Sequence, residues 1–242
     1  MKLRRYKLLL SLQVASLSVA VVWALPSPAF PPYATTDAET AGTSAVEFRL
    51  GLLQIEKTGS DSERLTPLSN LNFGLGPHFE INSEFEYAID EREFSDGAVG
   101  LKWARLEEGR GIGVETLVLL PVRSDLSGVG IESQFLRTWE QERSLLHFNA
   151  GAFYDPRGTD AERGWRTSAL AEFPRGRLRP GLELFVRDSN ATDAQIQAGV
   201  GLIASLPRLE IRTGLHVGLS DAAPDLEGNL WLSWKWPKDE LP

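Results

Sequence analysis

The side chains that most often carry catalysis are few in this chain, and their spacing does not assemble an active site. Its 242 residues include three histidines, His78, His147 and His216, and no cysteine, which excludes cysteine-based catalysis. His78 and Glu80 would share one face of a strand, but two ligands on one strand are weak evidence for a metal site. His147 has Asn149 on its face and no serine there, and no G-x-S-x-G motif occurs. We therefore expect no catalytic residue, no metal and no cofactor.

The segment His78–Asp90 shows how charged side chains could instead line a passage. Its sequence, HFEINSEFEYAID, alternates apolar residues with charged or polar ones. A β-strand sends successive side chains to opposite faces, so one face of this segment is apolar and the other is charged. The segment is long enough to cross a bilayer at a tilt, which takes about 9–11 residues. We therefore predict a membrane-spanning strand whose charged face meets water or a lumen.

The same alternation returns from Ala45 to Trp236, where no helical period is present. It marks about twelve strands of membrane-spanning length, an even number. The connections are alternately longer and shorter, beginning with the longer EKTGSDSER, as expected for extracellular loops and periplasmic turns. We predict an all-β fold, a single transmembrane antiparallel up-and-down β-barrel preceded by a cleaved signal peptide. Because the longer connections carry aspartate, the outer mouth should be acidic.

Aromatic residues gather near the predicted strand ends rather than the strand centres. Membrane barrels carry such girdles at both interfaces, whereas a soluble β-sandwich would place aromatic side chains in its core. The pattern favours the barrel, and a secreted sandwich stays an alternative. The predicted girdles consist of Phe73, Phe79, Trp103, Trp139, Phe173, Trp234 and Trp236 at the periplasmic end and Tyr87, Tyr154 and Trp165 at the extracellular end.

Charged residues on the opposite parity of the strands would face the lumen. Acidic residues concentrate in the early strands and basic residues in the later ones, and in a ring of about twelve strands the third lies opposite the ninth. An acidic wall facing a basic wall would orient dipolar solutes. Alternatively, these groups pair across neighbouring strands and plug the barrel, because burying unpaired charge is costly. The lumen-lining candidates are Glu80, Glu84, Glu86, Lys102, Glu115, Glu132, His147, Arg166, Arg179, Glu183, Arg187, Arg212 and His216.

The sequence predicts an export signal at the N-terminus and a short tail at each end of the barrel. A basic start, MKLRRYK, precedes a mostly apolar run and then small residues, as in a secretory signal peptide. We expect this signal over residues 1–29, with cleavage after Ala29 or Ala24; the alternative is a single membrane-anchor helix. Residues 30–44, rich in proline, threonine, alanine and acids, are predicted to form a flexible tail. The barrel would span residues 45–236, with a C-terminal tail over 237–242.

The overall charge excludes two kinds of partner. The formal net charge is −8, which argues against nucleic-acid binding and against polybasic association with a membrane surface. An exported chain without cysteine must be stable without disulfides. The expected partners are outer-membrane lipid, a small-molecule solute and, during biogenesis, the barrel-assembly machinery. The oligomeric state stays open.

Three short motifs resemble a known family. The segments DGAVGLKW, LLPVRSD around Pro121, and LHFNAG resemble the GD-x-x-LGLKY, LPTGD and LNxG-like strands of outer-membrane transporters assigned to the meta-cleavage pathway of phenol degradation. The likeness extends loosely from Phe48 to Trp236. The Thr-Gly that follows the proline in the family is replaced by Val122-Arg123. The resemblance implies a barrel that passes small, often hydrophobic or aromatic molecules, and it supplies no catalytic residues.

We therefore predict an outer-membrane channel or transporter for small solutes, hydrophobic or aromatic ones among them. The first alternative is a plugged, non-transporting barrel with a structural or surface-binding role. A barrel hydrolase acting on lipids and a secreted soluble β-sandwich are further alternatives.

Overall fold

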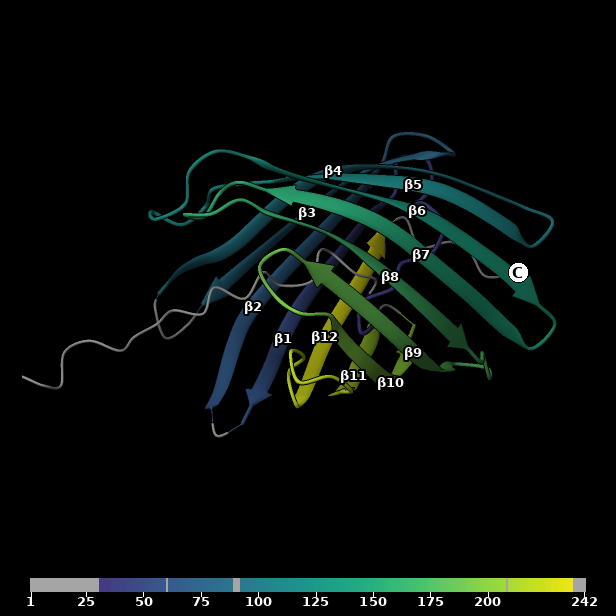
Figure 1. Cartoon of the computed structure of the whole chain (residues 1–242). Helices are drawn as coiled ribbons and strands as arrows, with labels where there is room; N and C mark the ends of the chain where they lie inside the picture. Colours follow the sequence, from purple (N-terminus) through teal and green to yellow (C-terminus); the bar gives the residue numbers. More distant parts are fainter. Residues whose placement is uncertain (1–30, 60, 89–91, 208, 237–242) are drawn as a thin grey trace, which may run out of the picture.

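The chain forms a closed barrel of twelve antiparallel β-strands in the computed structural model (Figure 1). The structure describes residues 31–59, 61–88, 92–207 and 209–236, and for residues 61–67 the backbone alone. The strands are β1 (Val46–Thr58), β2 (Asp61–Gly74), β3 (Phe79–Ala88), β4 (Glu93–Glu107), β5 (Arg110–Leu119), β6 (Gly130–Gln141), β7 (Ser144–Asp155), β8 (Glu162–Glu172), β9 (Leu178–Ser189), β10 (Gln195–Ser205), β11 (Glu210–Gly218) and β12 (Leu226–Trp236).

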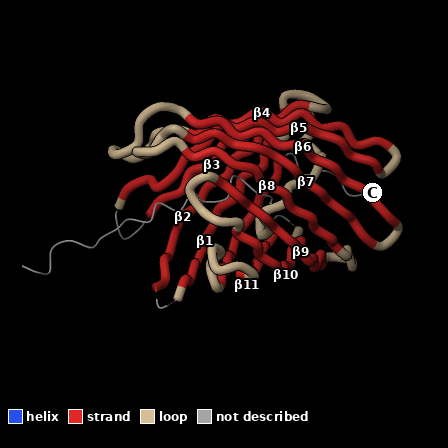
Figure 2. The backbone as a smooth tube through the Cα atoms, viewed as in Figure 1, coloured by secondary structure: helices blue, strands red, loops and turns tan. Residues whose placement is uncertain are grey.

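Each strand pairs with its sequence neighbours, and the first strand closes the ring on the last. Val46 of β1 lies opposite Phe73 of β2 on one side and opposite Trp236 of β12 on the other. Closure leaves the described strands without a free sheet edge, which a bilayer requires because lipid cannot satisfy backbone hydrogen bonds. In Figure 2 the wall of the barrel consists of strands, and loops join them at both ends. The predicted fold class, with twelve strands in up-and-down order, is confirmed.

Alternate side chains point to the outside and to the inside of the barrel. In β5, Ile112, Val114 and Val118 are 37%, 41% and 39% exposed, whereas Glu115 and Leu117 between them are buried. Exposed aliphatic side chains around a closed barrel are the pattern of a lipid-facing surface. No second sheet covers this surface in the described part of the chain, so the soluble sandwich is wrong.

The barrel has two different ends. At the end called here the turn end, β1 begins, β12 ends, and short connections such as 108–109 and 142–143 join the strands. At the other end, called the loop end, lie the longer connections 120–129, 156–161, 190–194 and 219–225. The first predicted long loop is wrong: β1 and β2 continue as a paired ribbon to Thr58 and Asp61. Gly59 has a φ of 60°, which glycine adopts readily, and this permits the tight turn.

One arginine, Arg157, links three segments at the loop end. Arg157 donates from Nη1 to Asp96 Oδ1 and to the Leu120 carbonyl, both at 2.8 Å, and from Nη2 to Asp155 Oδ2 at 2.8 Å. Burial alone would lower the pKa of the guanidinium, but the hydrogen bonds to Asp155 and the charge of Asp96 outweigh burial and raise it. Part of the acidic charge predicted for this mouth is therefore neutralised within it.

Residues 31–44 enter the barrel, and they are called the inner segment from here on. The segment has no helix or strand, yet Tyr33, Thr35 and Ala38 are only 2%, 0% and 0% exposed. The prediction of a flexible tail is therefore wrong for these residues. The physical reason is that carboxylates and hydroxyls of the barrel wall accept hydrogen bonds from the segment's backbone.

The other predicted terminal segments, residues 1–29 and 237–242, lie outside the described residues. In the described part of the chain, no helix has the length and apolar character of a membrane span.

Candidate functional site: the barrel lumen

The structure places all lumen-lining candidates on the inner side of the barrel wall. Glu84 and Arg179 are half-buried, and the others are buried. The candidates come from β3 to β11, since residues of one parity on every strand of a barrel converge on its interior. The inner segment fills the space between them.

The basic residues of the later strands are paired locally. Arg166 Nη2 lies 2.6 Å from Glu132 Oε1, and Arg187 Nη2 lies 3.1 Å from Glu162 Oε1. Arg179 contacts Glu172 in the same way. These contacts favour the alternative of paired lumen charges over an uncompensated basic wall.

Glu183 of β9 is the main anchor of the inner segment. Its carboxylate accepts hydrogen bonds from the backbone N–H of Ala34 at 3.0 Å and of Thr35 at 2.5 Å, and from Thr35 Oγ1 at 2.6 Å. It also lies 2.8 Å from His216 Nε2. Hydrogen bonds to an ionised acceptor are roughly twice as strong as neutral ones, so this carboxylate fixes the segment firmly.

Four further contacts distribute the anchoring around the ring. The Ala38 N–H donates to Thr138 Oγ1 of β6 at 2.9 Å, and the Ala41 N–H donates to Glu80 Oε2 of β3 at 2.5 Å. Lys102 Nζ of β4 lies 3.0 Å from Asp37 Oδ1. Arg212 Nη1 of β11 donates to the Pro31 carbonyl at 3.0 Å. The segment is therefore bound on opposite sides of the lumen.

Glycines on three strands make room for the segment. A Cβ at Gly181 would come within 2.5 Å of the Tyr33 hydroxyl, and a Cβ at Gly201 within 2.5 Å of Tyr33 Cε1. A Cβ at Gly214 would meet the Pro32 carbonyl at 2.8 Å. These distances are too short for real atoms, so glycine at these positions creates a notch that receives Pro32 and Tyr33.

A large cavity opens between the inner segment and the turn end. It has a volume of about 970 Å³ and is called the vestibule. Glu47 and Arg49 of β1 lie at 2.8 Å in an ion pair, and Arg212 lies 3.2 Å from Glu47. The wall therefore carries both charges in close pairs. Its lining includes Glu47, Arg49, Asn70, Glu80, Lys102 and Arg212.

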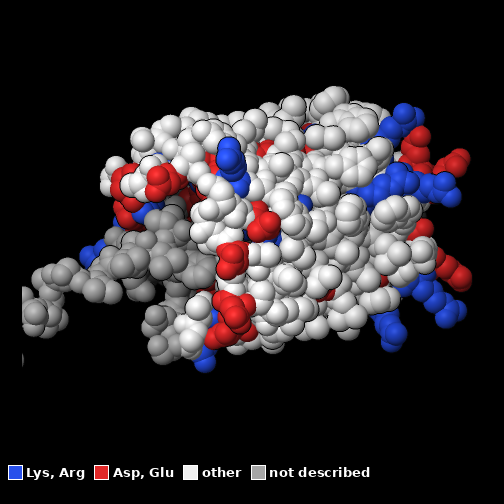
Figure 3. Space-filling model, viewed as in Figure 1, with Lys and Arg blue, Asp and Glu red and all other residues white. Residues whose placement is uncertain are grey.

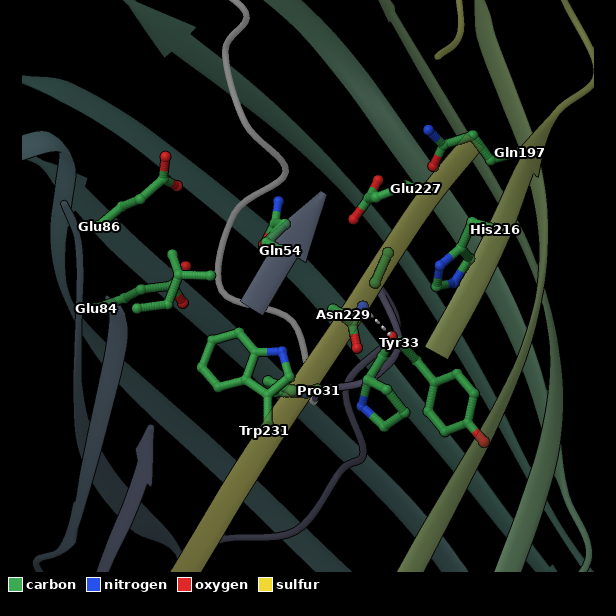
Figure 4. Close-up of a pocket in the computed structure, with 13 residues that line it drawn as sticks. Pro31, Tyr33, Gln54, Glu84, Glu86, Gln197, His216, Glu227, Asn229 and Trp231 are labelled. Atoms are coloured by element: carbon green, nitrogen blue, oxygen red, sulfur yellow. Dashed lines mark hydrogen bonds between the residues drawn. The ribbon is translucent and has the colours of Figure 1, made fainter. Parts of the chain in front are cut away.

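A small cavity lies on the other side of Tyr33, toward the loop end, and is called the acidic pocket (Figure 4). Its volume is about 60 Å³. Pro31, Pro32, Tyr33 and Ala34 of the inner segment line it together with the barrel wall. The wall contributes Gln54, Leu68, Glu84, Glu86, Gln197, His216, Glu227, Asn229 and Trp231.

The predicted girdle residues lie near the strand ends and on the outer surface. Seven are well exposed, with values from 37% for Trp139 to 52% for Trp236; these are Phe73, Phe79, Trp139, Tyr154, Trp165, Phe173 and Trp236. Tyr87, Trp103 and Trp234 are half-buried against neighbours; Trp234, for example, stacks on Phe48 at 5.9 Å. On the face shown in Figure 3, charged side chains gather at the two ends and the surface between them is largely uncharged.

One hydrogen-bonded series has the order of a catalytic triad. Thr138 Oγ1 lies 3.0 Å from His147 Nδ1, and His147 Nε2 lies 3.2 Å from Glu172 Oε2. The sequence spacing did not reveal it, because the threonine and the histidine face each other across β6 and β7. Thr138 is 0% exposed and accepts the Ala38 N–H, so no substrate reaches its hydroxyl. The series holds the inner segment in place.

Several lumen residues were not among the predicted candidates. Trp231 of β12 is 5% exposed and lies inside, although apolar residues on both sides of it made its face uncertain. Glu115 of β5 accepts hydrogen bonds from Gln134 on the neighbouring strand β6 and from Asn82 on β3, two strands away. Their parity with Glu80 and Glu132 was the signal that could have found them. His78 is not among the described residues that line either cavity.

Within the described residues, no group of three or more histidine, aspartate or glutamate side chains is placed to hold a metal ion. Fold and lumen together define a membrane-spanning barrel with a polar, partly filled interior.

This fold is that of outer-membrane channels of known structure. The chain is similar to the KdgM porin (TM-score 0.59, 8% identity, covering 78% of this chain and 98% of that one). It is similar to the NanC porin in a rhombohedral crystal form (TM-score 0.60, 7% identity, covering 78% of this chain and 98% of that one). It is also similar to the COG4313 outer membrane channel from Pseudomonas putida F1 (TM-score 0.60, 12% identity, covering 83% of this chain and 98% of that one). No protein-family model matches the chain, and no curated protein matches it.

Proposed function

We propose that the protein is an outer-membrane channel that passes small solutes and catalyses no reaction. The observation that carries the proposal is the vestibule, a space of about 970 Å³ within a lipid-facing barrel and lined by charged and polar side chains. A polar interior behind an apolar exterior is how barrels offer solutes a route through lipid. The likeness to porins and channels supports the same reading through the fold.

The solute class follows from the lining. Paired charges of both signs in the vestibule suit small polar or zwitterionic molecules, while Tyr33 and Trp231 offer aromatic surfaces inside the lumen. These surfaces agree with the hydrophobic or aromatic solutes implied by the resemblance to phenol-pathway transporters. With the turn end in the periplasm, solutes entering from outside would meet the acidic pocket first and the vestibule second.

A plugged barrel is the second candidate, and the inner segment favours it. Glu183, Thr138 and Glu80 hold this segment across the lumen, between the vestibule and the acidic pocket. In this reading the protein serves a structural or surface-binding role. The two candidates differ in one measurable property, the flow of ions through the resting protein.

Planar-bilayer recording of the purified mature protein tests the proposal. We expect discrete conductance steps, which heat-denatured protein and detergent alone should not produce. Liposome swelling with sugars, amino acids and small aromatic acids would then rank the solutes. A membrane-inserted, heat-modifiable barrel that shows neither steps nor swelling would contradict the channel and favour the plugged barrel.

A further inference from the structure

Two carboxyl groups, Glu84 and Glu227, line the acidic pocket without an ion pair to a described lysine or arginine. Glu84 receives one hydrogen bond, from Asn70 Nδ2 at 3.3 Å, and the charged groups that act on it are Glu86, Asp96 and Glu115, all acidic. Among the described residues, no lysine or arginine forms an ion pair with Glu84 or Glu227. A buried carboxyl group without a lysine or arginine partner is costly to ionise, so a positively charged occupant would stabilise its ionised form.

Three polar side-chain atoms of the residues that line this pocket have no hydrogen-bond partner among the described residues: the Tyr33 hydroxyl, His216 Nδ1 and Asn229 Oδ1. His216 is 4% exposed, and its ring points from β11 toward the inner segment (Figure 4). Its Nε2 lies 2.8 Å from Glu183 Oε2, while its Nδ1 has no hydrogen-bond partner. Asn229 donates from Nδ2 to the Pro32 carbonyl at 3.1 Å, which leaves its Oδ1 without a partner. With Nε2–H donating to Glu183, the neutral ring presents Nδ1 as an acceptor. In this tautomer, His216 Nδ1 and Asn229 Oδ1 are two acceptor atoms of the pocket that lack a donor among the described residues.

The remaining wall of the pocket is aromatic. Trp231 is 5% exposed and lies near Glu84, and Tyr33 stands on the other side of Pro31 (Figure 4). The face of an aromatic ring attracts a cation, most strongly when the pair is desolvated. Among the described residues, no group of three or more histidine, aspartate or glutamate side chains could hold a metal ion. Dispersed acceptors beside an aromatic ring suit a larger, softer cation, and about 60 Å³ limits its size.

We propose that the acidic pocket binds a small organic ammonium ion. Its N–H groups donate to the carboxylates of Glu84 and Glu227 and to Asn229 Oδ1, and its carbon part packs against Trp231. The binding rests on the pocket itself; the further step, that such cations are solutes of the pore, rests on the proposed channel function.

Titration calorimetry of the purified full-length mature protein with methylammonium chloride tests the proposal. We expect one saturable site. Glu84→Gln and Glu227→Gln should each weaken it about tenfold, since each removes one charged acceptor. Glu107→Gln is the matched control, because the Glu107 side chain is 59% exposed outside the lumen and its loss changes the net charge equally. Absence of saturable binding, or affinity that neither lumen variant changes, would overturn the proposal.

A second variant keeps all carboxylates and tests the organic character of the ligand. Trp231→Leu should weaken methylammonium binding several-fold and leave the weaker binding of potassium unchanged. Equal binding of the two cations by the wild type would contradict an organic ligand. Each variant is first checked for the heat-dependent gel shift of a folded barrel.

The outcomes for the pocket and for the channel are separable. Methylammonium binding by a protein without conductance would support the cation site and contradict the channel function. Conductance without methylammonium binding would support the channel function and contradict the cation site.

Discussion

The vestibule and the acidic pocket lie in one barrel and are built from the same twelve strands, yet they differ in size and in charge balance. The vestibule has about 970 Å³, and its charges meet in pairs such as Arg49–Glu47 at 2.8 Å. The acidic pocket has about 60 Å³ and contains Glu84 and Glu227, neither of which forms an ion pair with a described lysine or arginine.

The inner segment creates this difference. It occupies the notch of β9, β10 and β11 with Pro32 and Tyr33 and leaves the space toward the turn end open. The barrel wall alone would enclose a single lumen. A short chain segment without regular structure thus divides the lumen into a wide, charge-compensated part and a narrow, acidic part.

Removing the inner segment should have the largest effect. Deletion of residues 31–41 would join the two cavities, and we expect single-channel conductance to rise several-fold because the pore widens where the segment crosses it. The strand registers should persist, since Val46 and the later residues pair without the segment.

The control for this deletion is Glu39→Ala, which changes an exposed residue of the same segment and leaves its anchors intact. Planar-bilayer recordings of both variants decide the result. Equal conductance in the deletion and the wild type would show that the segment does not separate the two cavities in the working protein.

Filling the glycine notch should have the next largest effect. In Gly201→Val, the new Cβ would lie 2.5 Å from Tyr33 Cε1 and 2.9 Å from Pro32 Cγ, so the segment must leave the notch. We expect a smaller rise in conductance than in the deletion, because the displaced segment stays attached within the lumen. Gly228→Val is the control, since the nearest atom to its Cβ is 3.6 Å away. A similar rise in conductance in both variants would show that filling the notch is not the cause of the rise.

The barrel could be predicted from the sequence because strand alternation is a local property. Each run of apolar and polar residues reports its own two faces, so the strand order and the inward position of Glu80 or Arg166 follow without knowledge of distant residues. The first loop was predicted wrongly for the same reason. Polar residues at the ends of β1 and β2 read as a loop, although a paired ribbon satisfies their backbone equally well.

The inner segment could not be predicted because its partners are distant in the sequence. Thr35 and Glu183 are 148 residues apart, and the notch for Tyr33 comes from glycines on three strands. Its own composition is that of a linker. Trp231 was missed because apolar residues occupy both faces of its strand, so the alternation there does not distinguish lipid from lumen. Long-range complementarity, rather than local period, positions the parts that divide the lumen.

Weakening one anchor should loosen the segment without removing it. Thr35→Val keeps the shape of the side chain and removes the 2.6 Å hydrogen bond from Oγ1 to Glu183. Loss of a hydrogen bond to a charged group costs about 1.5–3 kcal/mol, so the segment should open more often. The chain has no cysteine, so Ala34→Cys provides a single reporter beside the acidic pocket. We expect faster thiol labelling of this reporter in the Thr35→Val background.

Thr40→Val is the matched control for this experiment, because the Thr40 hydroxyl makes only a 3.4 Å contact with the Pro77 carbonyl. Labelling rates that rise equally in the two backgrounds would count against Glu183 as the main anchor.

Ion selectivity should show the smallest effect, and it compares the two cavities directly. Glu210 lies in the vestibule, 2.5 Å from Arg212, so its charge is already compensated. Glu84 lies in the acidic pocket, where its charged neighbours are acidic. In a potassium chloride gradient, Glu84→Gln should lower the cation preference and move the reversal potential by a few millivolts. Glu210→Gln should move it less, because its removal leaves Arg212 paired with Glu47 at 3.2 Å. Reversal potentials that shift equally would mean that permeating ions sense the two charges alike, and the difference in charge balance would then have no consequence for transport.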